Sequence, residues 1–333
     1  FSERKEAHRW LKDFSLPNTT GDPDAFPLIN GSMKHFSRLQ LELLPLEQDR
    51  SGAAIPEIQT KTENIEICGF FRPSPQFSGD YFQYQRLGLL FLIIKCDISG
   101  HTPETAHVMT KTAALFNQTI NQVRDLPGHL QTDIDRYPLI LTDFMERLNS
   151  SLAVPDLSSQ FAALQVMLVD SATGSCLAVN SGDNRVPILR NSGVMEYVEL
   201  TSNPSSGLFS TDLIRAKGGF VVDRFNLKPG DILFLLTDGL EESGRNVRDE
   251  TGCKLETEEG YLMTETFGTA RISDIIEASF SGNSYKLERE QTKDYIIDFS
   301  QQGQTLRSAV NGLAVCEFLF RSYPGTGRVL TDN

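Results

Sequence analysis

The pattern of apolar residues first marks a short strand that leads directly into a long helix. Leu89–Ile94 is an unbroken apolar run, too short for a typical helix and rich in branched side chains, which indicates a buried central strand. Thr102, Pro103 and Glu104 then form a helix-start signature. The apolar residues that follow recur at steps of three and four and predict a helix ending before Pro127: Met109, Ala113, Phe116, Ile120 and Val123.

Beyond this helix the pattern repeats the helical period once and then becomes strand-like. A second helix is marked by Leu141, Phe144, Met145 and Leu148. Short apolar runs between Gly, Asn and Pro turns then predict an antiparallel meander of strands: Phe161–Asp170, Cys176–Asn180, Val186–Arg190, Val194–Leu200, Gly219–Arg224 and Ile232–Leu236.

The remaining elements lie on both sides of the meander. Upstream, Ile65–Phe71 predicts a strand, and the turn at Ser78–Tyr81 leads into another strand before Leu89. Downstream, the pattern predicts two helices and a closing strand: Ile272–Phe280, Lys286–Phe299 and Leu313–Phe320. This order predicts an α+β fold in which two antiparallel β-sheets are sandwiched between helices.

The chain divides into four expected parts. Residues 1–35 read as an N-terminal segment or linker, 36–60 as a linker helix and loop, 61–322 as one domain, and 323–333 as a tail. The linker helix is Phe36–Leu44, which Pro45 ends. Because the sequence starts at Phe1 rather than Met, we expect an upstream part, such as a sensor domain, that is missing from this chain.

Composition narrows the function classes. The net charge of -13 disfavours nucleic acid as a partner, because phosphates would be repelled. No apolar stretch approaches the roughly 20 residues of a membrane span, so we expect no membrane contact by this fragment. The five cysteines show no CxxC pairing and mostly lie in apolar runs, which indicates reduced core thiols in a cytoplasmic protein.

Asp97 is the first candidate for chemistry. It lies at the end of the central strand, and Gly100 follows within the next turn. A carboxylate at the end of a rigid strand suits a hard cation such as Mg²⁺ or Mn²⁺. The alternative is that Asp97 only caps a turn, and its local pattern alone leaves both readings open.

Three motifs in this order resemble one family. They are Ser78–Phe82 (SGDYF), Cys96–Met109, which begins CDISGH, and Pro229–Glu241, which contains PGDIL and TDGLE. Together they resemble the bacterial metal-dependent serine/threonine phosphatases of the protein phosphatase 2C superfamily, in the sporulation stage II protein E branch. The resemblance covers roughly Phe36 to Arg321.

The resemblance implies a site with two ions, Mn²⁺ or Mg²⁺. In that family pattern Asp97 bridges both ions, the Ile98 carbonyl binds one of them, Asp238 is a ligand of the other, and Asp80 holds metal-bound water. Two cations sharing a water lower its pKa toward neutrality and offset charge on the phosphoryl oxygens. Asp80, Asp97 and Asp238 are therefore the predicted catalytic residues.

The chain departs from the family pattern at three positions. Gln83 replaces a frequent acidic residue, and Thr102 replaces the usual Gly after His101. At the predicted last strand, Asn311 followed by Gly312 stands where the family has successive acidic residues. If Asn311 occupies the last ligand position, one ion is held weakly. Asp294 and Asp298, from the preceding predicted helix, are the less favoured substitutes.

These departures keep three hypotheses open. The first is an active metal-dependent phosphatase. The second is a pseudophosphatase, a binding or signalling module that has lost one metal ligand at Asn311, and the third is an unrelated α+β domain in which the three Asp motifs are turns. For the enzyme, the resemblance implies a phosphoprotein substrate, an anti-sigma-factor antagonist, and control by the upstream sensor. A sensor-linked helix also suggests a homodimer.

Overall fold

The computed structural model describes eight stretches of the chain. They are 57–71, 79–100, 103–126, 133–153, 160–247, 253–287, 295–300 and 306–321. The predicted N-terminal segment, the Phe36–Leu44 helix, the tail after 322 and the cap residue Thr102 lie outside the described residues. Among the helices described, none is long and apolar enough to span a membrane.

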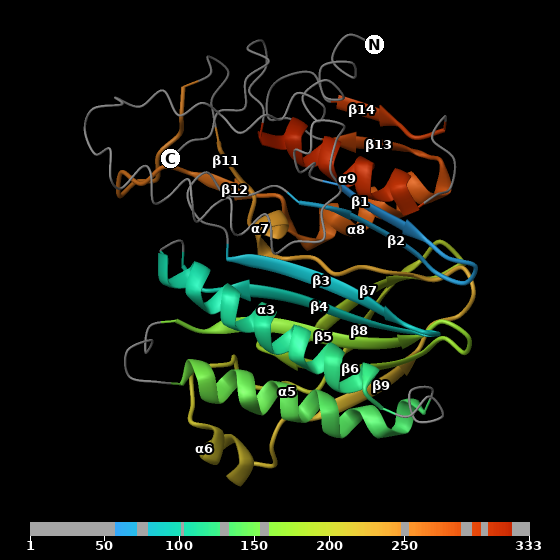
Figure 1. The fold of residues 1–333 in the computed structure, drawn as a ribbon. Helices are drawn as coiled ribbons and strands as arrows, with labels where there is room; N and C mark the ends of the chain where they lie inside the picture. Colours follow the sequence, from blue (N-terminus) through green and yellow to red (C-terminus); the bar gives the residue numbers. More distant parts are fainter. Residues whose placement is uncertain are drawn as a thin grey trace, which may run out of the picture.

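A five-stranded antiparallel sheet forms the centre of the molecule. Its strand order is β3-β4-β5-β6-β9, with β3 Asp80–Leu87, β4 Leu90–Ile98, β5 Ala162–Asp170, β6 Ser175–Ser181 and β9 Val222–Asn226. Two helices, α3 Pro103–Arg124 and α5 Tyr137–Leu152, cover one face of it (Figure 1). Alternate residues of β4 contribute to the core on that face: Leu92, Ile94, Cys96 and Ile98.

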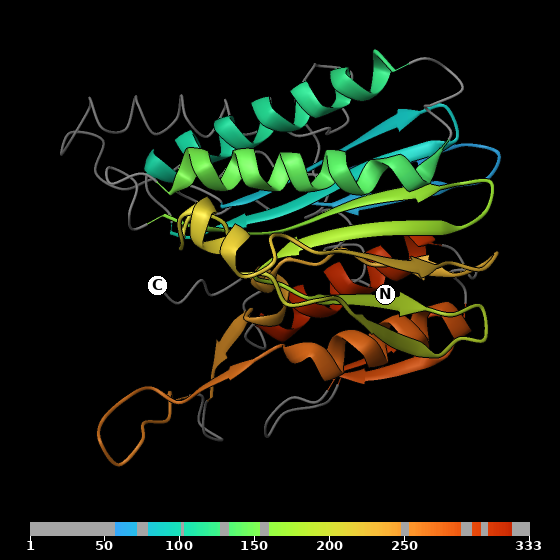
Figure 2. The same cartoon turned by 90° about the horizontal axis from the view of Figure 1, so that it is seen from below.

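A second, three-stranded sheet packs on the opposite face. Its order is β10-β7-β8, with β7 Arg185–Leu189, β8 Met195–Glu199 and β10 Ile232–Leu233. A small apolar core joins the two sheets: Met167, Ala178, Val186, Ile188 and Leu200. Two further helices, α8 Gly268–Ser281 and α9 Leu306–Arg321, cover the outer side (Figure 2). The four layers confirm the predicted class, an α+β fold with two antiparallel sheets between helices.

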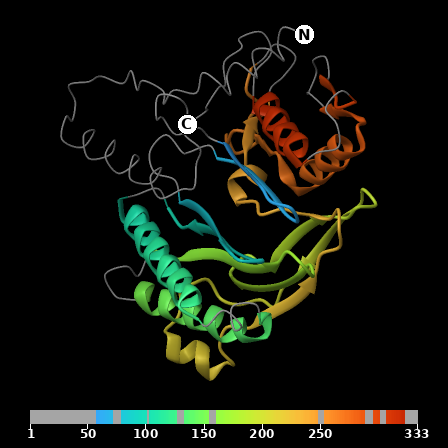
Figure 3. The ribbon, with the colours of Figure 1, turned by 45° about the vertical axis from the view of Figure 1, so that its right-hand side comes forward.

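Short elements complete the described fold. The hairpin of β1 Glu57–Lys61 and β2 Glu66–Phe70 lies next to α9 (Figure 3). The other short elements are η1 Ile134–Arg136, α6 Thr211–Ala216, α7 Asp238–Glu241, β11 Gly244–Asn246, β12 Thr264–Thr266, β13 Ser284–Leu287 and β14 Tyr295–Asp298. The sequence pattern did not predict β1, α6, α7 or the β11–β12 pair.

The predicted meander is wrong in one respect, because its strands divide between the two sheets. β9 pairs with β6 in the large sheet, whereas β10 pairs with β7 in the small one. Sequence order alone cannot show this division, since every strand in the series alternates or runs apolar in the same way.

The C-terminal part corrects two further predictions. The expected strand Leu313–Phe320 is helix α9, whose buried residues Ala309, Leu313, Cys316 and Phe320 recur at helical steps. The expected helix Lys286–Phe299 instead overlaps the end of β13 and includes β14, and these two strands pair with each other. In β13, and among the described side chains of β14, exposed residues alternate with less exposed ones, which is the period of a strand. Apart from Glu317, Leu313–Phe320 is apolar throughout, and such a run satisfies either period, which explains the error at α9.

Candidate active site

The β3–β4 hairpin brings the first two candidate carboxylates together. The two strands pair antiparallel with Asp80 directly opposite Asp97. Leu87 pairs with Leu90 across a tight turn in which Gly88 takes a φ of 66°. The length of this turn sets the register of the whole ladder. A shift of the register by one residue would send one of the two carboxylates to the other face of the sheet.

The Ile98 carbonyl lies against Gly79 at the end of the same hairpin. The Ile98 amide donates a hydrogen bond to the Gly79 carbonyl at 3.1 Å. A Cβ atom at Gly79 would lie only 2.1 Å from the Ile98 carbonyl oxygen. Only glycine therefore allows the backbone of residue 79 to pass beside this oxygen.

Asp238 reaches the same place from the second sheet. It begins the short helix α7, five residues after β10, and Figure 1 shows α7 beside the start of β3. A Cβ atom at Gly239 would lie 4.0 Å from Oδ2 of Asp80, so this turn packs on the first carboxylate. The Asp238 side chain is hydrogen-bonded to Asp97. The fold thus gathers Asp80, Asp97 and Asp238 from segments far apart in sequence.

The electrostatics of the cluster favour a bound cation. Burial raises the pKa of Asp97 to about 8, and the hydrogen bond with Asp238 and the charges of Asp80 and Asp238 add to the effect, while Lys95 opposes it. Carboxylates that crowd in this way repel one another unless a proton or cation intervenes. Carboxylate and carbonyl oxygens are the donors that Mg²⁺ and Mn²⁺ prefer. The donor set therefore fits a hard divalent ion.

The side chains are not gathered around one point as a finished metal site. Within the described stretches, no group of three or more His, Cys, Asp or Glu side chains is arranged to hold a metal ion. The contact between Asp97 and Asp238 is instead a hydrogen bond between two carboxyl groups. A hydrogen bond of this kind needs a proton, which a divalent ion would displace.

The raised pKa of Asp97 predicts how stability depends on pH when no metal is present. An unfolded Asp has a pKa near 4, so between about pH 4 and 8 the folded state holds a proton that the unfolded state has lost. The stabilisation of the folded state by the proton on Asp97 is complete below pH 4 and is lost as the pH rises through about 8. In a chelator, the Tm should fall from pH 5 to 9, more steeply than that of Asp97→Asn.

A matched control for this pH series is Asp170→Asn. Asp170 lies opposite Leu90, at the other end of β4. Its carboxylate accepts hydrogen bonds from Ala172 and Thr173 in the turn after β5. This variant should keep the slope of the original protein. Parallel curves for the original protein and Asp97→Asn would contradict the raised pKa.

The departures from the family pattern have different structural outcomes. Gln83 accepts a hydrogen bond from the Tyr81 hydroxyl and donates one to Asn117 at 3.1 Å, so it has a place in β3–α3 packing. Asn311 lies on helix α9 rather than on a closing strand, and its side chain is outside the described ones. Asp298 ends β14 opposite Ser284, and Asp294 lies outside the described residues. Lys95, next to the cluster, was not identified from the sequence.

Comparisons with known proteins agree with this fold. A family model described as stage II sporulation protein E matches residues 90–280. The SiaA-PP2C domain of Pseudomonas aeruginosa superposes with a TM-score of 0.50 at 18% identity, over 77% of this chain and 84% of that chain. This likeness shows a shared fold.

Two other solved structures are less similar. The RsbU and RsbW domains of a Mycobacterium tuberculosis protein give a TM-score of 0.42 at 22% identity, over 61% of this chain and 46% of that chain. The phosphatase domain of SpoIIE from Bacillus subtilis, with a fragment of its regulatory domain, gives 0.39 at 15% identity, over 75% of this chain and 73% of that chain. No curated protein matches in sequence.

Proposed function

The chain belongs to the stage II sporulation protein E family of protein phosphatase 2C-type domains, and from that premise we propose that it is a divalent-metal-dependent serine/threonine phosphatase. The observation that carries the proposal is the meeting of Asp80, Asp97 and Asp238 from the two sheets. An unrelated fold with three Asp-containing turns would have no reason to bring them together.

The proposed roles follow from the position of each group. Asp97 and Asp238, with the Ile98 carbonyl, would hold two Mn²⁺ or Mg²⁺ ions, and Asn311 stays a predicted further ligand. When bound, the ions supply a water of lowered pKa and offset charge on the phosphoryl group. Asp80, opposite Asp97, would accept hydrogen bonds from a water and orient it. The unscreened carboxylates would repel a phosphate dianion, so we expect no activity without metal.

The pseudophosphatase remains the second candidate, and it rests on Asn311 and Gly312. The strand that placed these residues at the ligand position is a helix. Gly312 also has a packing reason, because a Cβ atom there would lie 3.1 Å from the Phe299 ring and 3.3 Å from Cβ of Ser279. Both findings weaken the argument for a lost metal ligand, on which the pseudophosphatase rests.

We also propose the setting in which this enzyme works. Its substrate would be a phosphoprotein of bacterial signalling, an anti-sigma-factor antagonist, and an upstream sensor would control it in a cytoplasmic homodimer.

The test is phosphate release from a phosphoserine protein or peptide during a Mn²⁺ titration. The metal-free protein should be inactive, and turnover should rise with Mn²⁺ and saturate. Mg²⁺ should support the same reaction at a different half-saturating concentration. A folded protein that releases no phosphate at millimolar Mn²⁺ would direct the search to binding partners and favour the pseudophosphatase.

A further inference from the structure

Lys95 is a buried lysine between the two sheets, next to the carboxylate cluster. It lies on β4 two residues before Asp97, so the two side chains share the face of the strand that points to the second sheet. Its side chain is only 6% exposed. A buried ammonium group is costly unless it is paired and hydrogen-bonded, so its contacts indicate what it does.

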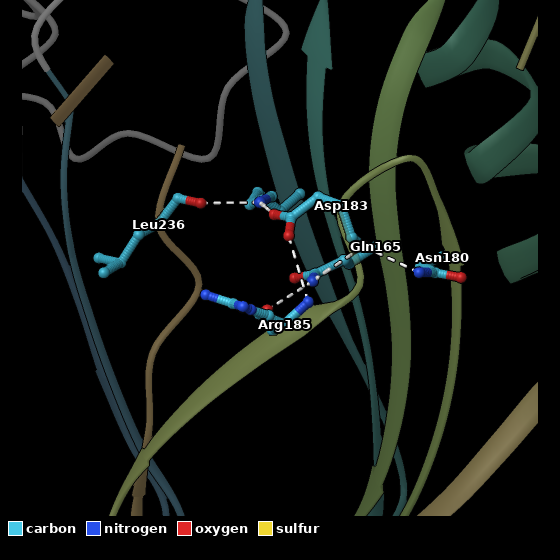
Figure 4. Close-up of polar contacts among 6 residues, drawn as sticks. Gln165, Asn180, Asp183, Arg185 and Leu236 are labelled. Carbon is cyan, nitrogen blue, oxygen red and sulfur yellow. Dashed lines mark hydrogen bonds and ion pairs between the residues drawn. The ribbon is translucent and has the colours of Figure 1, made fainter. Parts of the chain in front are cut away.

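The Lys95 ammonium joins the two segments that carry Asp97 and Asp238. It donates a hydrogen bond to the Leu236 carbonyl at 2.7 Å and forms an ion pair with Asp183 (Figure 4). Leu236 lies two residues before Asp238, just as Lys95 lies two residues before Asp97. A single side chain therefore spans the gap between β4 and the segment that leads into α7.

Asp183 is itself held in place, in the connection between β6 and β7. Its carbonyl accepts hydrogen bonds from Asn180 at 3.0 Å and from Gln165 at 3.3 Å, and the Arg185 amide donates to its carboxylate at 3.3 Å (Figure 4). Gln165 is also the register partner of Lys95 on β5. The backbone of Asp183 is thus held by β5 and β6 of the large sheet, and its carboxylate, which faces Lys95, is held by the start of β7.

A second ion pair holds the other end of the same segment. Before β10, Asp231 pairs with Arg190 at 2.7 Å and accepts the amides of Lys228 at 2.9 Å and Asn191 at 3.0 Å. The segment 231–238 is therefore held near the end of β7 by the Arg190–Asp231 ion pair and to β4 by the hydrogen bond from Lys95 to Leu236. Only the hydrogen bond from Lys95 lies next to the carboxylate cluster, so Arg190 is a matched comparison for Lys95.

We propose that Lys95 is a positioning residue that fixes the separation of Asp97 and Asp238, and thereby sets the affinity of the site for divalent metal. The inference rests on the proposed function. Lys95 touches Leu236 and Asp183 and is assigned no contact with the substrate. Asp183, held on both sheets, keeps the ammonium aimed at the Leu236 carbonyl.

Positioning and simple charge predict opposite results, which makes the inference testable. If Lys95 acted only as a nearby positive charge, its removal would make the site more negative and strengthen Mn²⁺ binding. If it positions the ligands, its removal lets the segment before α7 shift and weakens binding. Groups that orient metal ligands typically change metal affinity 10–100-fold.

The experiment measures Mn²⁺ binding directly, by the electron paramagnetic resonance signal of free Mn²⁺ and by calorimetry. Lys95→Met should bind Mn²⁺ at least about 10-fold more weakly than the original protein. In the phosphatase assay, its half-saturating Mn²⁺ concentration should rise by the same factor, and turnover should recover at saturating metal. Lys95→Arg, which can still donate to both partners, should restore part of the affinity.

Two further variants separate positioning from folding. Arg190→Met removes the matched ion pair and should lower the Tm without changing Mn²⁺ affinity. Lys95→Met combined with Asp183→Leu removes both charges, so it folds without an unpaired ion but should still bind Mn²⁺ weakly. A folded Lys95 variant with unchanged or tighter Mn²⁺ binding overturns the inference alone. An original protein that binds no Mn²⁺ overturns the proposed function with it.

Discussion

Asp97→Asn is expected to lower metal-dependent phosphate release by at least about 100-fold. The loss of a group in the outer shell of a metal site already costs 10–100-fold, and Asp97 is proposed to contact both ions. Asn keeps the size of the side chain and can donate a hydrogen bond to Asp238, which Asp97 contacts in the fold. The folded structure should therefore persist. The measurement is turnover of a phosphoserine substrate at several Mn²⁺ concentrations.

The same substitution should not destabilise the metal-free protein, and this separates lost function from lost folding. Near pH 9 the original protein carries an ionised Asp97 in a buried, negative cluster, and Asn removes that repulsion. Its Tm in a chelator should accordingly be higher than that of the original protein at this pH. Asp170→Asn, at the far end of β4, should leave turnover unchanged. Full activity of Asp97→Asn would contradict the assigned metal role.

The strand and the helix at the centre of the fold could be predicted from the sequence, because each of these elements has a single strong signal. Asp80 and Asp238 were singled out only by the resemblance of their motifs to the phosphatase family, and Asp97 by its place at the end of the strand together with that resemblance. The run before Asp97 reads only as a strand, and the helix after it has one clear apolar face, which the structure confirms in β4 and α3. What the sequence could not show is that Asp80 lies opposite Asp97. That register depends on the turn at Gly88, where a shift of one residue would leave the apolar runs themselves unchanged.

Lys95 was missed because charge normally ends a buried strand. The apolar run was taken to stop at Ile94, whereas β4 continues to Ile98 with Lys95 buried inside it. The ion pair with Asp183, 88 residues further along the chain, offsets the cost of burying the Lys95 ammonium group. A contact between residues so distant leaves no local trace in the sequence, so only the folded arrangement of the two sheets shows it.

Gly79→Ala is the second substitution with a large expected effect. Its new Cβ atom would lie 2.1 Å from the Ile98 carbonyl oxygen, which is backbone and cannot rotate away as a side chain could. We expect the free energy of unfolding to fall by about 2 kcal/mol or more, and the Tm therefore to fall by roughly 4–8 °C. Because the predicted metal ligand at Ile98 must move, Mn²⁺ affinity measured by calorimetry should fall at least about 10-fold.

Gly88→Ala, in the turn of the same hairpin, shows which part of that effect belongs to the site. Gly88 has a left-handed φ of 66° and nothing within 4 Å of an added Cβ atom. Alanine there carries backbone strain of about 1 kcal/mol and displaces no neighbour. Both variants should therefore lower the Tm, but only Gly79→Ala should weaken Mn²⁺ binding. Equal Mn²⁺ affinities in the two variants would mean that the Ile98 carbonyl is not a ligand, and the strain at residue 79 would then concern folding alone.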